Sequence, residues 1–402
     1  MPLEGDEIVR LAARGDGVTR DGRFVPMTAP GDRIADDGTV EAGPHHTPPP
    51  CRHFPECGGC QLQHVDDVAY AQFLCDRIAG ALTAQGVAVP EIRPPHISPP
   101  RTRRRAALRV ERRGVQLLLG FNAGASHRIV DMRECHILRP ELFALVAPLH
   151  GLLARLIGPR GRAEVRLAWT DQGADLLLQG LIPEGLERAE AVTDFARAHR
   201  LARFAADDGY GAQTLWEPEP VTVTLGGVPV SFPHGAFLQA TAEGEAALVA
   251  AVTEAVGEAR IVADLFAGLG TFALALEGRV LAAEGARDAA LALRAAAGRA
   301  QRTLFVDHRD LYRRPFDACE LARFEAVVLD PPRAGAADQV DALAASPVPA
   351  IAYVSCNPAT FARDAAKLVD GGYRLRWIKP VGQFRWSTHV ELAACFEKGA
   401  PK

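Results

Sequence analysis

Lysine is almost absent from this 402-residue sequence, in which only four of the 45 basic residues are Lys. The formal net charge is −4, so the whole molecule is not a basic nucleic-acid binder. Any contact with RNA or DNA would therefore depend on local patches. Arginine suits bidentate phosphate contacts, although the Ala-rich composition indicates a GC-rich genome as a simpler cause of the bias.

Long apolar runs are also missing, and none reaches the length needed to span a bilayer. The acidic start, residues 1–17, lacks the apolar centre of a signal peptide. We therefore expect a soluble, cytoplasmic protein with no membrane partner. The hydrophobic fraction of 48% is ample for cores, and the length predicts two or three domains.

Eight cysteines occur, and clustered cysteines in a chain of this kind indicate a metal or catalytic site more often than disulfides. Cys51, Cys57 and Cys60 lie close together in CRHFPECGGCQLQH. Cys135 is a better candidate for a fourth ligand than Cys75, which lies on a helical apolar pattern. Four thiolates fit either zinc or an iron–sulfur cluster, and the spacing does not choose between them. Structural cysteines without a ligand role are the remaining alternative.

The most basic stretch is RTRRRAALRVERR, residues 101–113, which reads as a strand with a basic solvent face. A solvated face is the simplest interpretation. Arg103, Arg104 and Arg105 run together just before the strand, however, which makes phosphate binding a competing one.

The N-terminal residues 1–45 contain short apolar pieces separated by Gly and Asp turn signals, which fit a small β-barrel of the oligonucleotide-binding kind. A simple appendage is an equal alternative. Residues 41–50, EAGPHHTPPP, form a Pro-rich connector.

From Pro233 onward the pattern becomes alternating strands and helices, which predicts a mainly parallel sheet. A helix is expected over 243–256, followed by a strand over 260–265, a loop containing Gly268 and Gly270, and another helix. Gly268 and Gly270 would allow a ligand to approach the loop closely. Glu284, at the end of the next strand, could accept hydrogen bonds from both hydroxyls of a ribose.

Cys356 follows a buried strand, 350–354, and precedes Asn357-Pro358 and a helix expected from about Thr360. Strand ends of this kind are where open α/β sheets bind ligands, and a thiolate there is a good nucleophile. A small buried core residue is the alternative reading of Cys356, and Cys319 and Cys395 are predicted to be core residues.

Together, CGGCQLQH, FLQAT, DLFAGLGTF, DPPRAG, SCNPAT and HVE resemble the S-adenosylmethionine-dependent RNA uracil-5-methyltransferases over nearly the whole chain. The resemblance implies a Rossmann-like class I methyltransferase domain, a central α+β iron–sulfur domain and a shortened TRAM-like, OB-like β module. The corresponding ranges are 233–402, 46–232 and 1–45. Thr241 stands where the family has Asn.

The resemblance also implies roles for individual residues. Cys356 would be the nucleophile and Glu391 the general base, while Cys51, Cys57, Cys60 and Cys135 would hold a [4Fe–4S] cluster. Phe237 and Gln239 would contact the target base, and Arg103, Arg104 and Arg105 are the candidates for RNA phosphates. The implied contacts to S-adenosylmethionine are Gln239, Phe266, Gly268, Thr271, Glu284, Asp310 and Asp330.

The chemistry agrees with these roles, because carbon 5 of uracil reacts with a methyl donor only after a thiolate has added to carbon 6. We therefore expect a monomeric RNA uridine C5-methyltransferase that acts on 23S rRNA and not on DNA. A tRNA enzyme is the nearest alternative, an RNA cytosine-5-methyltransferase is less compatible with these motifs, and an inactive iron–sulfur RNA-binding protein is the alternative from another class.

Overall fold

The computed structural model describes residues 7–399, and the outer ends of the first and third predicted domains fall outside this range. The described chain divides into two compact units, each built from distant parts of the sequence. The predicted three-domain division stays a prediction. The first unit comprises residues 7–73, 97–221 and 384–388, and the second comprises residues 74–96, 222–383 and 389–399.

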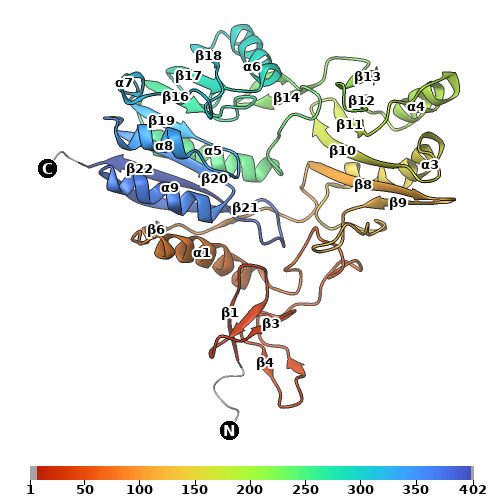
Figure 1. Cartoon of the computed structure of the whole chain (residues 1–402), viewed down its shortest axis with the longest axis horizontal. Coiled ribbons are helices and arrows are strands. Elements are labelled where there is room, and N and C mark those ends of the chain that lie inside the picture. The colour runs from red at the N-terminus through yellow and green to blue at the C-terminus, as the bar shows by residue number, and fades with distance from the viewer. Residues whose placement is uncertain (1–6, 400–402) are drawn as a thin grey trace. The chain divides into compact units, whose positions relative to one another are not determined.

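A nine-stranded sheet forms the centre of the second unit, in the order β18-β17-β16-β19-β20-β22-β21-β6, with β7 also paired to β21 (Figure 1). Neighbours from β18 to β20 are parallel, and β22 is antiparallel to both β20 and β21. The strands are β6 (Glu91–Ile92), β7 (His96–Ile97), β16 (Ile261–Leu265), β17 (Arg279–Glu284), β18 (Leu304–His308), β19 (Ala326–Leu329), β20 (Ala350–Ser355), β21 (Tyr373–Gly382) and β22 (Glu391–Lys398).

The central strands β19 and β20 consist almost entirely of buried apolar residues. Such runs are typical of parallel strands covered on both faces, which is why the sequence predicted them within a residue or two. The mainly parallel α/β sheet predicted for the C-terminal part is therefore confirmed, and Cys356 lies at a strand end as expected.

Helices cover this sheet and are mostly well capped. Thr241 is the N-cap of the predicted helix α5 and accepts a hydrogen bond from the N–H of Gly244. Helix α8 packs beside α9, and α6 packs against β17 and β18 (Figure 1). The helices are α5 (Ala242–Val256), α6 (Arg287–Arg299), α7 (Ala318–Leu321), α8 (Ala337–Ala344) and α9 (Pro358–Asp370), and a hairpin of β14 (Thr222–Leu225) and β15 (Val228–Ser231) packs on α6.

Two predictions for this unit are wrong. The stretch from Phe266 to Leu276 forms successive turns instead of the expected helix after the glycine loop. The N–H groups of Leu274 and Leu276 make bonds of the α-helical kind, to Gly270 and Phe272, but the N–H of Ala275 bonds Phe272 three residues back, so the turns do not join into a regular helix. Cys319 is exposed on the short helix α7 instead of lying in the core, whereas Cys395 is buried as predicted.

A six-stranded sheet in the order β13-β12-β11-β10-β8-β9 organises the first unit, and β10 and β11 form an antiparallel hairpin within it. Leucines of α3 pack on this sheet to form the core. The elements are β8 (Arg105–Arg113), β9 (Gln116–Gly120), α2 (Pro140–Phe143), α3 (Val146–Leu156), β10 (Arg162–Thr170), β11 (Gly173–Gln179), α4 (Leu186–Ala198), β12 (Arg203–Asp207) and β13 (Gln213–Trp216).

The N-terminal part of this unit contains a three-stranded antiparallel sheet and a separate two-stranded pair at the predicted positions. Its identity as an OB-like module stays a prediction. The strands are β1 (Ile8–Leu11), β2 (Gly17–Thr19), β3 (Phe24–Val25), β4 (Arg33–Ile34) and β5 (Val40–Glu41), and the predicted helix that follows is α1 (Asp67–Ala84). None of the helices within residues 7–399 is long and apolar enough to cross a membrane.

Candidate functional site

The end of β20 holds Cys356 between a buried strand and the first turn of α9. Asn357 is the N-cap of α9, and its side-chain oxygen accepts a hydrogen bond from the N–H of Ala359 at 3.1 Å. Pro358 is the first helical residue, where its missing N–H costs nothing. Cys356 therefore lies close to the positive end of a 13-residue helix, where negative charge is favoured.

Strand register brings two carboxyl groups to the same place. Ser355 of β20 pairs with Leu392 of β22, so the next residue on each side, Cys356 and Glu391, continue the ladder as neighbours. On the other flank Asp330 directly follows β19, which runs parallel to β20. The sheet thus brings together three residues that the sequence had selected separately.

At this end of the strands, burial and nearby charges favour the neutral forms of Cys356 and Asp330. Burial raises the pKa of the Cys356 thiol, the charges of Glu391 and Asp330 raise it further, and the cation of Arg333 acts in the opposite direction. Burial also raises the pKa of Asp330 well above its ordinary value, assisted by the charges of Glu391 and Asp264. Positive charge brought to this edge would favour the Cys356 thiolate.

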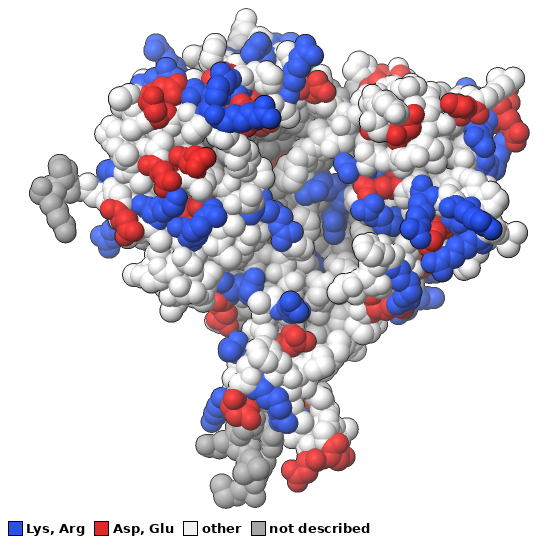
Figure 2. Space-filling view, viewed as in Figure 1, with Lys and Arg blue, Asp and Glu red and all other residues white. Residues whose placement is uncertain are grey.

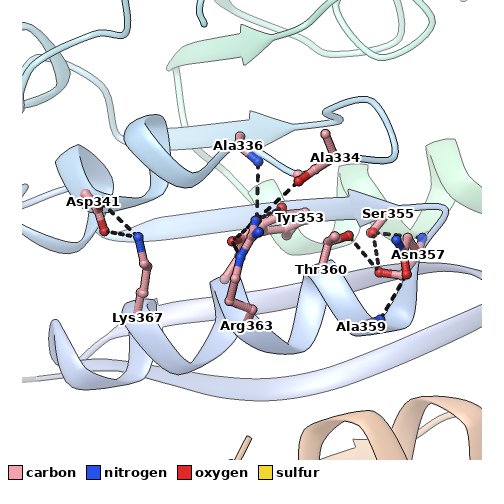
Figure 3. A network of polar contacts seen from close by, with 12 residues as sticks. Ala334, Ala336, Asp341, Tyr353, Ser355, Asn357, Ala359, Thr360, Arg363 and Lys367 are labelled. Carbon is pink, nitrogen blue, oxygen red and sulfur yellow. Dashed lines mark hydrogen bonds and ion pairs between the residues drawn. The ribbon is translucent and has the colours of Figure 1, made fainter.

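Helix α9 anchors the loop that carries Ala334 and Ala336 (Figure 3). The Asn357 amide and the Thr360 hydroxyl donate hydrogen bonds to the carbonyl of Arg333 at 3.2 and 3.3 Å. The Arg363 guanidinium donates to the carbonyl of Ala334 at 3.3 Å. The loop after Asp330 is therefore tied to the same helix that begins beside Cys356.

Beneath this loop lies a buried carboxylate that no sequence motif indicated. The Tyr353 hydroxyl donates to Asp364 at 2.7 Å, and the N–H of Ala336 donates to the same oxygen at 3.3 Å (Figure 3). Arg363 donates to the other oxygen of Asp364. A Cβ on Gly335 would lie 2.7 Å from Asp364, so glycine is needed for the loop to approach this closely.

Gln239 and Glu391, both predicted site residues, are buried and share a contact with a third residue, Gln383. The Gln383 amino group donates to Gln239 at 2.7 Å and also to the carboxylate of Glu391. Phe237, two residues before Gln239, is 60% exposed. An aromatic ring open to solvent beside buried polar groups can stack on a base.

The glycine loop after β16 is held by Glu284, the residue predicted to bind a ribose. One oxygen of Glu284 accepts a hydrogen bond from the N–H of Gly268 at 2.8 Å, and the other accepts from Ala286 at 2.6 Å. Gly268 and Gly270 have φ values of 56° and 93°, which favour glycine. Glu284 therefore shapes the loop as well as offering its remaining lone pairs to a ligand.

Aromatic rings stand beside this loop. Phe266 has a φ of 64°, uncommon for a bulky residue and often found at functional sites, and its ring lies 5.4 Å from that of Tyr312. Asp310 is exposed and accepts a hydrogen bond from the N–H of Tyr312, while Thr271 is half-buried. The rings of Phe266 and Tyr312 form an aromatic wall on which a flat ring could pack.

Asp264, near the end of β16, is a further site residue that sequence reasoning missed. It is fully buried and accepts a hydrogen bond from the N–H of Ala273 at 2.8 Å. Burial raises the pKa of Asp264 to about 7, and the charge of Glu284 contributes. The acidic residue in the DLF segment could have indicated it.

In the first unit, the four cysteines predicted as ligands line one cavity, which we call the cysteine cavity. It comprises Cys51, Cys57, Cys60 and Cys135, with Phe121 among the other lining residues. Cys135 thus lines the same cavity as the three cysteines of the Gly-containing loop, and its role as a ligand stays a prediction. Among the described residues, no group of three or more His, Cys, Asp or Glu is arranged to hold a metal ion.

The donor chemistry of the cysteine cavity nevertheless suits a cationic group. Burial raises the pKa of Cys60 to about 12, and the other three thiols contribute in the same direction. Backbone N–H groups of Ile137 and Leu138 oppose this effect at Cys135. A positive centre in the cavity would remove the repulsion among the thiolates, so the four thiols match a metal or an iron–sulfur cluster in donor type, although not in their arrangement among the described residues.

The three arginines proposed for RNA phosphates have different settings. The Arg103 guanidinium lies over the rings of Phe384 and Phe121, at 5.2 and 5.7 Å from their centres. Burial lowers the pKa of Arg103, and thiols of the cysteine cavity act in the opposite direction. Arg105 is half-buried with its guanidinium 5.9 Å from Phe384. Arg103 is thus better placed to interact with the cavity than with phosphates.

Exposed arginines occur farther along β8 and on its neighbour β10, and blue and red side chains mix in Figure 2 over the part that carries β8 and β9. Arg113 and Arg162 pair with Glu111 at 2.7 and 2.9 Å, and Arg166 pairs with Glu164 at 2.7 Å. The end of the basic stretch at Arg113 is therefore part of a mixed, solvated face, which agrees with the simpler reading of the sequence.

Comparison with known proteins agrees with this geometry. A family model for tRNA (uracil-5-)-methyltransferase matches residues 303–399, the part that contains Cys356 and Glu391. An RNA methyltransferase of Zymomonas mobilis is 54% identical over 394 residues, covering 98% of this chain and 99% of the relative. The 23S rRNA (uracil(1939)-C(5))-methyltransferase RlmD of Chromohalobacter salexigens is 33% identical, covering 99% of this chain and 90% of the relative.

Among solved structures, the Pyrococcus abyssi tRNA (uracil-54, C5)-methyltransferase in complex with S-adenosyl-L-homocysteine has a TM-score of 0.75 at 23% identity. It covers 98% of this chain and 99% of its own, so the class I methyltransferase fold with mixed α/β content is shared. Because two relatives above 30% identity cover nearly the whole chain, the protein belongs to the RNA (uracil-5-)-methyltransferase family.

Proposed function

We propose that this protein is an S-adenosylmethionine-dependent RNA uridine C5-methyltransferase that works through a covalent adduct between Cys356 and the target uracil. The observation that carries the proposal is the meeting of Cys356, Glu391 and Asp330 at one sheet edge. One nucleophile, one base and a neighbouring cofactor loop are the groups that this chemistry requires.

The proposed steps follow from the protein's own residues. The Cys356 thiol releases its proton to solvent and the thiolate adds to carbon 6 of uracil, so that the electron pair moves to carbon 5 and the adjoining carbonyl. S-adenosylmethionine, when bound, would supply the methyl group for carbon 5, and its sulfur would keep the electron pair of the broken bond and leave as S-adenosylhomocysteine. Glu391 removes the remaining proton from carbon 5, the double bond between carbons 5 and 6 re-forms, and the carbon–sulfur bond breaks to return the Cys356 thiolate.

For the methyl donor we propose the loop after β16 together with its aromatic wall. Glu284 and the glycines would hold the ribose side, and Phe266 would pack on the adenine. The methionine part would then reach toward Cys356, where the positive sulfonium would favour the thiolate. The proposed contacts are Gln239, Phe266, Gly268, Thr271, Glu284, Asp310 and Asp330.

The proposed substrate is a uridine of 23S rRNA, because the RlmD relative covers nearly the whole chain. A tRNA uridine is the alternative, which the name of the matched family model and the Pyrococcus abyssi structure support. An enzyme with either substrate is expected in the cytoplasm. The target must be extruded from its stack for Cys356 to reach carbon 6, and exposed Phe237 is the candidate ring to stack on it.

In the first unit we propose that Cys51, Cys57, Cys60 and Cys135 hold a [4Fe–4S] cluster of structural role. All four proposed ligands are thiols lining one cavity, and no step above needs an electron. We propose Arg104 and Arg105, more than Arg103, for phosphate contacts, because Arg103 is packed between two rings.

The experiment that tests the proposal combines product analysis with trapping of the adduct. Purified protein, labelled S-adenosylmethionine and either 23S rRNA or tRNA lacking 5-methyluridine should give 5-methyluridine at one position, found by mass spectrometry of RNA fragments. Glu391→Gln should slow turnover by about 10²–10⁴-fold, because the base is lost after methyl transfer. A covalent RNA–protein band should then accumulate on a denaturing gel.

Two results would overturn the proposal. Methylation of cytosine carbon 5, or an inactive wild-type protein that still binds RNA, would remove uridine methylation as the function. Normal turnover by Glu391→Gln would remove Glu391 as the base. Methylation of tRNA alone would replace rRNA by the alternative substrate.

A further inference from the structure

Gln383 follows the last residue of β21 and is only 1% exposed. Its amino group donates to Gln239 at 2.7 Å and to the carboxylate of Glu391, and its oxygen accepts from the N–H of Ala240 at 2.7 Å. One side chain thus joins the proposed base to a predicted substrate residue. No motif in the sequence pointed to it.

The surrounding backbone fixes which way the Gln383 amide points. The N–H groups of Ala240 and Thr241 can only donate, so the atom of Gln383 facing them must be the oxygen. The amino group must then face Glu391 and Gln239. Because that amino group can only donate, Gln239 presents its own oxygen to Gln383 and directs its amino group elsewhere.

The first turn of α5 makes room for this arrangement. A Cβ on Gly244 would lie 2.6 Å from the Cβ of Gln383 and 3.3 Å from its oxygen. Glycine inside a helix costs about 0.5–1 kcal/mol relative to alanine, so its presence here is explained by the close approach of Gln383. Gln383 is therefore held by the backbone N–H groups of Ala240 and Thr241 and has room beside α5 because Gly244 lacks a side chain.

We propose that Gln383 is a positioning residue for proton removal from carbon 5: it holds the Glu391 carboxylate and fixes the orientation of the Gln239 amide. The inference rests on the proposed function, because Glu391 acts as a base only in that reaction. A carboxylate that accepts this hydrogen bond is held in one rotamer, so Glu391 is already positioned to accept the proton from carbon 5. Gln383 itself does not touch the reacting atoms in this proposal.

A matched control exists in the same unit. Gln339 is also 1% exposed, and its amide bonds the backbone of Phe316, accepting at 2.9 Å and donating at 3.1 Å. Replacing Gln339 by Met removes a buried glutamine of the same size without touching Glu391. It therefore separates loss of stability from loss of positioning.

The experiment compares Gln383→Met with Gln339→Met, wild type and Glu391→Gln in a single-turnover reaction with substrate RNA. Methyl transfer and release of free methylated RNA are followed separately. We expect Gln383→Met to transfer the methyl group within a few-fold of the wild-type rate. Its RNA–protein adduct should decay at least tenfold more slowly. Gln339→Met should lose stability but release its product at the wild-type rate.

Gly244→Ala provides a second test should Gln383→Met fail to fold. It favours the helix while pushing against Gln383, so we expect a folded protein that also accumulates adduct. Release at the wild-type rate by a folded Gln383→Met or Gly244→Ala protein, while Glu391→Gln traps adduct, would overturn the positioning role and leave the proposed function standing. Absence of 5-methyluridine and of adduct with wild type would instead overturn the proposed function.

Discussion

The four cysteines of the cysteine cavity and the single cysteine Cys356 differ in the groups that surround them. In the cysteine cavity of the first unit, four thiols face one another and backbone N–H groups point at their sulfurs. In the second unit, Cys356 is alone at a strand end, with Glu391 and Asp330 as acidic neighbours and Arg333 as the cation.

Burial raises the thiol pKa in both places, so burial cannot distinguish a ligand from a nucleophile. The neighbours do. Thiols that share a cavity repel one another as thiolates and are satisfied by a common positive centre. A thiol between a helix N-terminus and a base can instead add to a substrate and leave again. The predictions below test this distinction.

The largest expected effect is at Cys356. Cys356→Ala should lower methylation on the order of a thousandfold or more, because no adduct can form. Binding of S-adenosylmethionine, measured by calorimetry, should be unchanged. Cys319→Ala changes an exposed thiol in the same unit and should retain wild-type activity. Methyl transfer by the Cys356→Ala protein would show that the two cysteine sets do not differ as described.

The second prediction concerns the cysteine cavity. Protein purified without oxygen should be brown and contain about four irons per chain, as four thiolate ligands of a [4Fe–4S] cluster imply. Cys60→Ser should lose most of this iron and unfold at a lower temperature, while binding of S-adenosylmethionine by the second unit persists. Metal analysis and calorimetry measure these outcomes. One zinc per chain in colourless wild-type protein would contradict the cluster.

The third prediction concerns Arg333, the cation near Cys356. Its cation lowers the pKa of Cys356, whereas burial and two carboxylates raise it. Arg333→Met should therefore raise that pKa further, so that adduct formation slows several-fold at pH 7 and recovers as the pH rises. Rates of adduct formation with Glu391→Gln across pH measure the shift. Arg323→Met, which removes an exposed arginine, should leave the profile in place.

The smallest expected effect on activity is at Tyr353, whose hydroxyl donates to buried Asp364. Tyr353→Phe should cost about 1.5–3 kcal/mol in the free energy of unfolding, since a hydrogen bond to a charged group is lost. Arg363 and Ala336 still hold Asp364, so methylation should change by less than about twofold. Tyr312→Phe removes a weaker bond to Gly335, and denaturant unfolding should show a smaller loss.

Much of the second unit could be predicted because its strands are continuous apolar runs with abrupt ends. Residues 326–329 and 351–355 are buried throughout, and each stretch is followed by a proline within three residues. Cys356 and Asp330 follow such ends, and Glu391 begins the antiparallel strand β22, so their meeting follows from the order and direction of the strands.

What the sequence could not indicate depends on side-chain packing between distant segments. Gln383 is one glutamine among several, and only the fold brings Gln239 and Glu391 to it. Arg103 looks like a phosphate ligand in a run of arginines, but the rings of Phe121 and Phe384 cover it. Asp364 is likewise in an ordinary amphipathic helix, and its burial follows from the loop held above it.

Segment 384–388 belongs to the first unit although it lies near the end of the chain. The buried Tyr70 hydroxyl donates to the carbonyls of Phe384 and Ser387 at 3.2 Å, and the N–H of Gln61 donates to Trp386 at 2.7 Å. Domains usually fold in the order of their synthesis on the ribosome. Here the unit that contains the N-terminus cannot complete its packing until residue 388 has been translated, so ribosomes that stop earlier release a chain whose first half is also incomplete.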